Sequence, residues 1–197
     1  MNFYYRNLIN SCGLSSLNKT NQVRIGGGEW RSRLLKFPDA VGLRPTPDRV
    51  RQTVFNWLGQ ELNDLICLDL FAGTGVMGFE ALSRGAKQVV LIEKSPIAFQ
   101  ALMHNKILIK ADTAQIIQTD AQLFLAKNQQ KFDVVFCDPP YHLQLLDKIL
   151  PSLNQHLSTN GLVYVEAEYS LLTVEGFDVI KHGKAGSVHY HLLKLSS

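Results

Sequence analysis

Residues 65–78 read LICLDLFAGTGVMG, and this stretch decides the fold. An apolar run that contains Asp69 leads directly into glycines at positions 73, 75 and 78, the G-x-G-x-x-G spacing that lets a backbone turn tightly against a ligand. The apolar run predicts a strand, and the residues after Gly75 predict a helix. Because the glycines lie between a strand and a helix, the stretch predicts a nucleoside-binding loop and not an ordinary turn.

Downstream of this loop, short apolar strands alternate with helices. The strands are continuous Val/Ile/Leu runs, which is typical of strands buried on both faces of a mostly parallel sheet. The predicted strands are residues 66–71, 88–93, 115–118, 133–138 and 162–166, and the predicted helices are residues 77–84, 98–109, 121–128 and 144–157. Residues 177–181 and 188–195 follow without a helix between them and predict a closing antiparallel hairpin. The fold class is therefore α/β.

Upstream of the loop, the chain is basic. Residues 1–51 contain nine Lys and Arg against three Asp and Glu, whereas the remaining residues contain 11 against 14. Residues 23–35 predict a β-hairpin that turns at its glycines, with Arg31 and Arg33 on one face of the second arm. Thr46 as N-cap and Pro47 as first helical residue predict a helix after it. A basic end on a mildly acidic body indicates contact with a polyanion.

The acids at the strand ends indicate which nucleoside the loop binds. A dinucleotide places its pyrophosphate at the helix N-terminus, where the carboxylate of Asp69 would repel it. S-adenosylmethionine has no phosphate and carries a sulfonium and an ammonium, so Asp69 favours that cofactor. Glu93, at the end of the second strand, is placed to accept from ribose hydroxyls. Asp120 is placed to accept from the adenine amino group, to cap the following helix, or to do both.

A second motif, Asp138-Pro139-Pro140-Tyr141, follows the fourth strand, at the sheet edge where ligands bind. The exocyclic amine of a nucleobase is a poor nucleophile because its lone pair is delocalised into the ring. Two acceptors that bind its N–H groups, the Asp138 carboxylate and the Pro139 carbonyl, would expose that lone pair, and Pro140 holds residue 139 extended. Tyr141 offers a ring on which the base stacks. The motif predicts transfer of a methyl group to an aromatic amine without a metal.

With these residues placed, the chain resembles the bacterial small-subunit ribosomal RNA guanine-N2 methyltransferases over about residues 23–195. The resemblance rests on the arginine-, glycine- and tryptophan-containing run of residues 24–33, on residues 43–51 (LRPTPDRVR), on residues 69–75 and on residues 138–141. It implies a Rossmann-like methyltransferase domain behind a small basic extension, S-adenosylmethionine as methyl donor, and a guanine amino group of 16S rRNA in an assembled small subunit as acceptor. Gly26, Glu29 and Ser32 depart from the aliphatic, Lys and Gly residues of the family, which lowers the hairpin's charge and is expected to loosen its turn.

From the motifs and the resemblance together we assign three groups of residues. The catalytic group is Asp138, Pro139, Pro140 and Tyr141. The cofactor-binding group is Asp69, Phe71, Ala72, Gly73, Thr74, Gly75, Glu93, Lys94, Asp120 and Ala121. The RNA-contacting group is Arg24, Arg31, Arg33, Arg44, Arg49 and Arg51. We expect a loose tail over residues 1–22, a basic hairpin and helix extension over residues 23–60, and the methyltransferase domain over residues 61–197.

Other features narrow the class of protein. The three cysteines, Cys12, Cys67 and Cys137, have no zinc spacing and are expected to be structural. We expect no metal, and we interpret Glu166 and Glu168 as solvent-facing. The absence of a signal-like start or an apolar run long enough to cross a bilayer predicts a cytoplasmic protein, expected to be a monomer.

Three other functions remain open at this point. The same amine clamp suits N6 of adenine in DNA, the glycine spacing alone suits a nicotinamide-dependent oxidoreductase, and the basic extension suits an RNA-binding module without catalysis.

Overall fold

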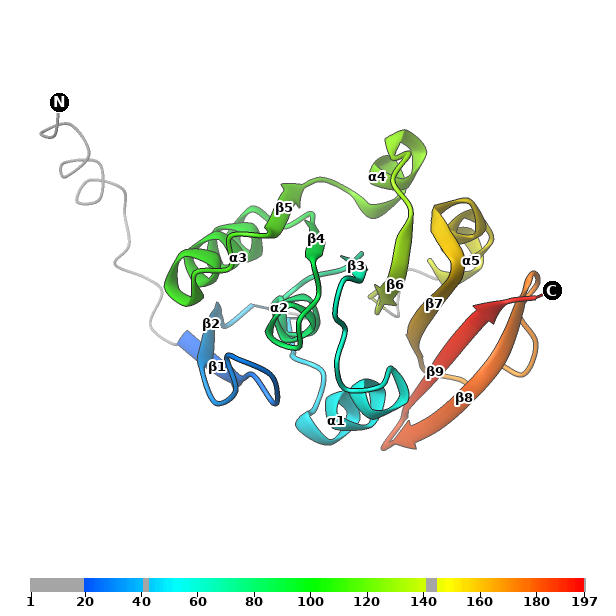
Figure 1. Cartoon of the computed structure of the whole chain (residues 1–197), viewed down its shortest axis with the longest axis horizontal. Coiled ribbons are helices and arrows are strands. Elements are labelled where there is room, and N and C mark those ends of the chain that lie inside the picture. The colour runs from blue at the N-terminus through cyan, green and yellow to red at the C-terminus, as the bar shows by residue number, and fades with distance from the viewer. Residues whose placement is uncertain (1–19, 41–42, 141–144, 197) are drawn as a thin grey trace, which may run out of the picture.

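The computed structural model describes residues 20–40, 43–140 and 145–196. Its centre is a seven-stranded sheet of order β5-β4-β3-β6-β7-β9-β8 (Figure 1). The strands of this sheet are β3 (Ile66–Asp69), β4 (Gln88–Glu93), β5 (Ala114–Gln118), β6 (Phe132–Cys137), β7 (Leu157–Ala167), β8 (Phe177–Ala185) and β9 (Val188–Leu195). The helices are α1 (Asp48–Trp57), α2 (Val76–Ser83), α3 (Pro96–Ile109), α4 (Ala121–Lys127) and α5 (Leu146–Leu153), with a 3-10 turn η2 (Asn154–His156).

The sheet has the predicted topology. Strands β3 to β7 pair in parallel, and β9 pairs antiparallel with both β7 and β8. The mostly parallel sheet with an antiparallel C-terminal hairpin is therefore confirmed. The hairpin folds back so that its second strand, β9, lies beside β7 and β8 forms the edge.

Several predicted boundaries differ from the observed ones, and the largest difference lies at the start of β7. The helix expected over residues 144–157 ends at Leu153, and Leu157 is already the first residue of β7. Leu157 pairs with Phe132 across a register shift in β6, so a contact with a neighbouring strand, which local periodicity does not record, extends β7 backwards.

Helices cover both faces of the sheet. Figure 1 shows α1, α2 and α3 on one side and α4 and α5 on the other. Each face has its own apolar core, one around Phe55, Phe79 and Phe136 and the other around Phe132 and Ile149. Cys67 and Cys137 are buried, as predicted, whereas Cys12 lies outside the described residues. In the described part of the chain, no helix has both the length and the apolar composition needed to cross a bilayer.

The N-terminal hairpin extends further than predicted at both ends, and its connecting loop is longer. Its strands are β1 (Thr20–Arg24) and β2 (Leu34–Pro38), so Arg31 and Arg33 lie in the connecting loop and not on alternating positions of a strand. Ile25 closes this loop, because its N–H donates to Arg33 O (3.0 Å) and its carbonyl accepts from Ser32 N (2.9 Å).

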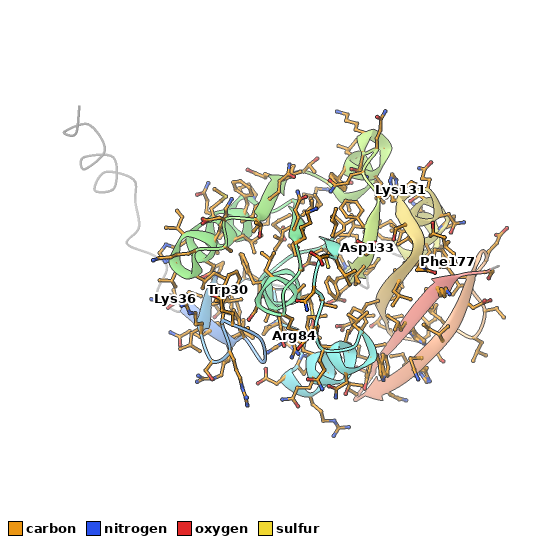
Figure 2. The ribbon with its side chains drawn as sticks, viewed as in Figure 1. Trp30, Lys36, Arg84, Lys131, Asp133 and Phe177 are labelled. Atoms are coloured by element: carbon orange, nitrogen blue, oxygen red, sulfur yellow. The ribbon has the colours of Figure 1, made fainter. Side chains whose placement is uncertain are left out.

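The hairpin packs against the helices on its side of the sheet. The amide of Asn105, on α3, accepts from Lys36 N (3.0 Å) and donates to Lys36 O (2.8 Å), which fixes β2 against the helix. Trp30, labelled with Lys36 in Figure 2, donates its backbone N–H to Ser83 Oγ (2.8 Å) at the end of α2. β2 is thus hydrogen-bonded to α3, and the loop to the end of α2.

The start of α1 also differs from the prediction. Pro47 occupies the N-cap position and no side chain caps the helix. Thr46, the predicted cap, is 7% exposed, and its carbonyl accepts a hydrogen bond from Arg51 (2.7 Å).

Candidate active site

The predicted functional acids meet at the carboxyl ends of neighbouring strands. β3 lies between β4 and β6, and the chain builds outward from β3 first on one side and then on the other. Such a switch point leaves a crevice at the carboxyl ends of the strands. Asp69 ends β3, Glu93 ends β4, and Asp138 directly follows β6. The fold therefore brings these three predicted residues to the same edge.

The glycine loop connects β3 to α2 in a conformation that requires glycine at position 75. Gly75 is the N-cap of α2 and has φ 76°, in the left-handed region. A Cβ atom there would lie 2.4 Å from Leu102 Cδ2, so the loop also packs too closely against α3 for a side chain. The predicted strand–loop–helix unit is confirmed, while its role in cofactor binding stays a prediction.

Two carboxylates hold this loop in place. Asp69 Oδ2 accepts from the backbone N–H of Gly78 (3.0 Å), and Glu93 Oε2 accepts from that of Gly73 (2.8 Å). The other oxygen of Glu93 accepts from Ser95 N (2.6 Å). The acids predicted to bind a cofactor thus also shape the loop, a role that the sequence did not reveal.

Asp69 lies in a strongly desolvated position. It is 4% exposed, and its burial, with the negative charge of Glu93 adding to it, raises the pKa of Asp69 to about 7. Only the hydrogen bond from Gly78 acts in the opposite direction. A cation at this position would favour the ionised carboxylate.

Asp138 occupies a similar environment. It is half-buried, and its pKa is raised well above the ordinary value by burial first, then by the charges of Glu166 and Asp69. Pro139 is buried and Pro140 is exposed. Tyr141, predicted to stack on the base, lies outside the described residues. Asp138 therefore lies at the carboxyl edge of the sheet and, when ionised, is a stronger base than an exposed carboxylate.

Asp120 is confirmed as a helix cap. Its Oδ1 accepts from Gln122 N (2.9 Å) at the start of α4, and its Oδ2 lies 3.1 Å from the exposed ammonium of Lys94. Burial acts to raise the pKa of Asp120, but the contacts with Lys94 and with the first N–H groups of α4 outweigh it and lower that pKa. The adenine contact predicted for this residue stays a prediction.

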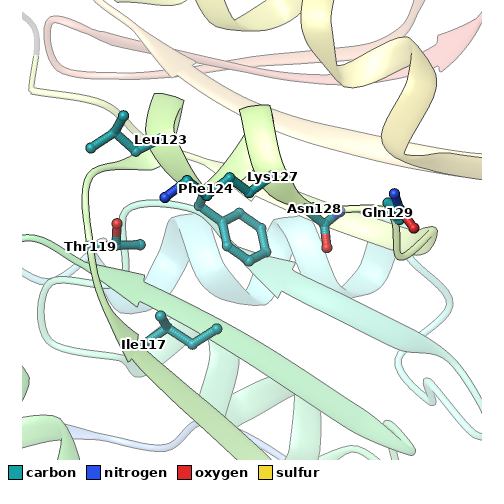
Figure 3. Close-up of a pocket in the computed structure, with 7 residues that line it drawn as sticks. All are labelled: Ile117, Thr119, Leu123, Phe124, Lys127, Asn128 and Gln129. Atoms are coloured by element: carbon teal, nitrogen blue, oxygen red, sulfur yellow. The ribbon is translucent and has the colours of Figure 1, made fainter.

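A pocket opens beside Asp120, between β5 and α4 (Figure 3). The ring of Phe124 projects into it from the helix, and Ile117 lies on the strand below. The lining residues are Ile117, Thr119, Leu123, Phe124, Lys127, Asn128 and Gln129. None of them was singled out from the sequence. The only indication in the sequence is that all of them lie within nine positions of Asp120.

Glu166 was wrongly predicted to face solvent. It is 3% exposed, and its Oε1 accepts from the hydroxyl of Tyr164 (2.6 Å). Burial follows from packing on both faces of β7, which an alternating pattern at the end of a strand does not reveal. A signal was present, because Glu166 lies near the carboxyl end of a buried strand, as Asp69 and Glu93 do. Glu168, in contrast, is exposed as predicted.

The predicted RNA-contacting arginines separate into two groups. Arg24, Arg31, Arg33, Arg44 and Arg49 are exposed. Arg51 is 1% exposed, and its guanidinium donates to the carbonyls of Thr46 (2.7 Å) and Arg24 (2.6 Å). A phosphate could not reach it without breaking these bonds, so burial removes Arg51 from the predicted group.

Arg51 instead belongs to a buried charge cluster centred on Glu80 of α2. Glu80 is fully buried. Its Oε2 pairs with Arg51 Nε (3.2 Å), and its Oε1 pairs with Arg84 Nη2 (2.8 Å). Gly26 N donates to the same carboxylate (3.1 Å), and Arg84, labelled in Figure 2, lies 4.6 Å above the Phe55 ring. The cluster joins the hairpin, α1 and α2. In the sequence, this cluster is indicated only by Glu80, the one charged residue of α2. Every residue of that helix is buried.

The chain matches a protein family and is similar to known proteins over most of its length. The model of a family described as conserved hypothetical protein 95 matches residues 23–194. The chain is 43% identical over 178 residues to ribosomal RNA small subunit methyltransferase D of Escherichia coli strain K12, covering 88% of this chain and 90% of that protein. It is 42% identical over 183 residues to the protein of the same name from Haemophilus influenzae, covering 89% and 95%.

The chain is also similar to a solved structure over most of its length. The structure of the Escherichia coli protein yhhF is 41% identical to the chain, has a TM-score of 0.82, and is matched over 89% of this chain and 99% of its own. The molecule therefore has a Rossmann-like methyltransferase fold.

Proposed function

The chain belongs to the family described as conserved hypothetical protein 95, and we propose that it transfers a methyl group from S-adenosylmethionine to the N2 amino group of one guanine in 16S rRNA. The names of its relatives support methylation of small-subunit rRNA. The observation that carries the proposal is the placement of Asp138 beside Asp69 at the switch point of the sheet.

The donor set fits this cofactor. S-adenosylmethionine supplies a methyl group on a positively charged sulfur and also carries an ammonium. Asp69 and Asp138 are carboxylates whose pKa values are raised by burial and by neighbouring negative charge, and a cationic ligand would relieve both effects. Asp69 and the loop from Phe71 to Gly75 would hold its amino-acid end, and Glu93 its ribose. Asp120 and Ala121, with the adjoining pocket, would border its adenine.

The remaining residues act on the acceptor amine. The Asp138 carboxylate and the Pro139 carbonyl would each accept one N–H of the amine, which directs the nitrogen lone pair toward the methyl group. Catalysis is then mainly positioning together with charge stabilisation. As the N–C bond forms and the S–C bond breaks, the nitrogen loses one proton, which Asp138 would accept. Tyr141 would stack on the base.

The exposed arginines would contact the phosphate backbone. Arg24, Arg31 and Arg33 lie on the hairpin and its loop, and Arg44 and Arg49 lie just before and within α1. The methyltransferase fold occupies most of the chain, so we infer that an assembled small subunit supplies the shape that selects the nucleotide. A guanine that lies outside an RNA helix can swing out of its stack and enter a binding site on the protein.

The test is methylation of undermodified substrate. Small subunits from cells lacking this protein are incubated with the purified protein and labelled S-adenosylmethionine, and the labelled nucleoside is identified and mapped. The expected product is N2-methylguanosine at one position. Label found only on N6 of adenine, or only when DNA is supplied, would contradict the proposal. Free 16S rRNA, assayed in parallel, separates recognition of the subunit from recognition of the RNA alone.

A further inference from the structure

The tip of the C-terminal hairpin lies at the same edge of the sheet as the acids of the crevice. Ala167, which ends β7, pairs with His189 on β9, and Lys184 of β8 lies opposite the same histidine. β9 and β8 are the second and third strands beyond β6, so this tip lies roughly 10–15 Å from Asp138 along the carboxyl edge. Three histidines gather there: His182, His189 and His191.

Two of these imidazoles face each other nitrogen to nitrogen. His182 Nε2 and His189 Nδ1 are 3.3 Å apart, whereas the ring centroids are 5.6 Å apart and the ring planes differ by only 12°. Because the rings are nearly parallel and the nitrogens are closer than the centroids, both nitrogens lie between the rings. They therefore share one proton in an N–H···N hydrogen bond. The buried ring of His191 stacks on His182, with centroids 4.8 Å apart.

This shared proton limits what the pair can offer to a ligand. A neutral imidazole has one N–H and one bare nitrogen, so the neutral pair presents one N–H and one bare nitrogen outward. Uptake of one proton places an N–H on both outer nitrogens, His182 Nδ1 and His189 Nε2, and keeps the inner hydrogen bond. A second proton would remove the acceptor of that bond. The pair is thus built to gain one positive charge together with two outward donors.

The charges that act on the cluster are positive. Lys184 is exposed and forms no ion pair with any residue that the structure describes. The pKa of His189 is lowered by partial burial first, and then by the charges of Lys184 and His182. Burial first, and then the other two histidines, lowers the pKa of His191 to about 4, so this ring stays neutral behind the pair. A bound anion would relieve the repulsion and favour the protonated pair.

An exposed aromatic ring adjoins the cluster. In the loop after β7, Leu171 N donates to His191 Nε2 (3.0 Å), and Tyr169, two residues earlier, is 52% exposed. The charge of Asp147, on α5, acts on Tyr169 but is not among those that shift the pKa of His189 or His191. Surfaces that bind single-stranded RNA combine cations with rings on which bases stack. The combination favours an RNA strand over an acidic protein.

We propose that Lys184 and the His182–His189 pair form a phosphate site for the RNA strand that carries the target guanine, and that this site takes up one proton when the RNA binds. Tyr169 supplies a ring on which a neighbouring base stacks. The inference rests on the proposed function, because the ligand is the same RNA. It adds a second RNA-contacting surface, at the other end of the molecule from the N-terminal hairpin (Figure 1).

The test is the salt dependence of binding to undermodified small subunits, measured without cofactor at pH 8 and at pH 6. One phosphate contact with a single strand contributes about 0.7 to the slope of log K against log salt. We therefore expect the slope of the parent protein to be steeper by about 0.7 at pH 6, where the pair is protonated in the complex. The double variant His182→Gln with His189→Gln cannot take up this proton, so the pH effect should disappear.

Matched variants separate this site from general effects. His104→Gln removes an exposed histidine on α3 and should retain the pH effect. Lys184→Ala should reduce the salt slope at both pH values by about 0.7. Lys181→Ala should leave it unchanged, because Lys181 precedes His182 on β8 and points to the opposite face of the sheet. Tyr169→Ala should weaken binding at least ~5-fold at both pH values without changing either slope.

Two binding results would overturn the inference. One is equal salt slopes of the parent at pH 6 and pH 8, a comparison that requires no variant to fold. The other is a pH effect that the double histidine variant retains in full. NMR titration of the histidine rings in chloride and in inorganic phosphate of equal ionic strength tests the source of the anion. We expect the same pKa of His189 in both, and a higher value in phosphate alone would assign the site to a free anion instead of RNA.

These outcomes are distinct from failure of the proposed function. Each overturning result concerns binding and leaves the mapped methylation of guanine as it stands. A parent protein that shows the expected pH effect but methylates no guanine would contradict the proposed function while the RNA site remained.

Discussion

Arg51 on α1 and Glu80 on α2 form an ion pair in the protein interior, with Arg51 Nε 3.2 Å from Glu80 Oε2 and both side chains at most 2% exposed. The same carboxylate accepts from Gly26 N at the start of the hairpin loop. One buried acid therefore connects the proposed RNA-contacting segment to the domain that carries the glycine loop. The geometry between the exposed arginines and the crevice depends on this contact.

The first prediction concerns this pair. Glu80→Ala should lower the free energy of unfolding by about 3–5 kcal/mol, because it leaves the buried Arg51 guanidinium with only the exposed Asp48 carboxylate (2.8 Å) as counter-charge. Urea denaturation of the parent and the variant measures the difference. Arg49→Ala, which removes an exposed arginine from the same helix, serves as the control and should change stability by less than about 0.5 kcal/mol. Equal effects of the two substitutions would mean that the buried pair is not what stabilises this region.

The second prediction concerns the pH dependence that Asp69 imposes. Its pKa is raised to about 7 in the folded protein from an ordinary 3.8, so between these values the folded state binds more protons than the unfolded state. The ligand-free protein should lose stability as pH rises from 4 to 7, and the loss should level off above that pH. The whole effect is at most on the order of 4 kcal/mol.

Asp69→Asn isolates this effect. The amide oxygen can still accept from Gly78 N but cannot ionise, so the variant should gain stability relative to the parent as pH increases from 5 to 8. Urea denaturation at the two pH values measures the gain. A parent-to-variant difference that is independent of pH would show that Asp69 does not titrate in this range.

The third prediction concerns Asp138. Asp138→Ala should lower kcat for methylation by about 100- to 1,000-fold, the loss typical of removing one group that stabilises transition-state charge. Affinity for small subunits should be unchanged, since the exposed arginines are untouched. Single-turnover methylation and a subunit-binding assay measure the two quantities. If turnover persists at the parent rate, Asp138 is not part of the amine clamp.

The fourth prediction concerns the hairpin loop. Ser32 has φ 72°, a left-handed conformation that is unfavourable for a residue with a Cβ. Ser32→Gly should raise the free energy of unfolding by about 0.5–1 kcal/mol, because relief of this strain outweighs the added freedom of the unfolded chain. Thermal unfolding tests this, and Ser32→Ala, which keeps the Cβ, should bring no gain. A lower melting temperature for Ser32→Gly would contradict the strain argument.

The fifth prediction concerns Arg31 and Arg33. Replacing both with Ala should weaken binding to small subunits and reduce the slope of log K against log salt by about 1.5–2, as expected when two phosphate contacts are lost. Lys181→Ala with Lys194→Ala removes the same charge from β8 and β9 and should leave the slope unchanged. Because Arg33 also donates to Ile109 O (3.3 Å), the melting temperature of the arginine variant is measured alongside. Similar slopes for the two double variants would place the RNA elsewhere.

Much of the fold could be predicted from local sequence. The Val/Ile/Leu runs, the glycines after Asp69 and the prolines after Asp138 each act within a few residues, and β4 was predicted with its observed bounds, Gln88–Glu93. The errors occurred where a distant element decides the outcome. β7 begins five residues early because Leu157 pairs with Phe132. The second arm of the hairpin begins at Leu34 because Ile25 and Arg33 close a longer loop.

By itself, the sequence determined the α/β class and the order of the motifs along the chain, because backbone geometry and hydrophobic period are local properties. Only the tertiary structure decided which charged residues are buried. Arg51 and Glu166 resemble their exposed neighbours Arg49 and Glu168 in the sequence, yet they lie in the interior. Arg51 is paired with Glu80, and Glu166 accepts a hydrogen bond from Tyr164. The packing that buries these residues depends on how the elements come together, which the sequence alone does not reveal. A charge is stable in the interior only when such partners surround it, and that condition is met in three dimensions.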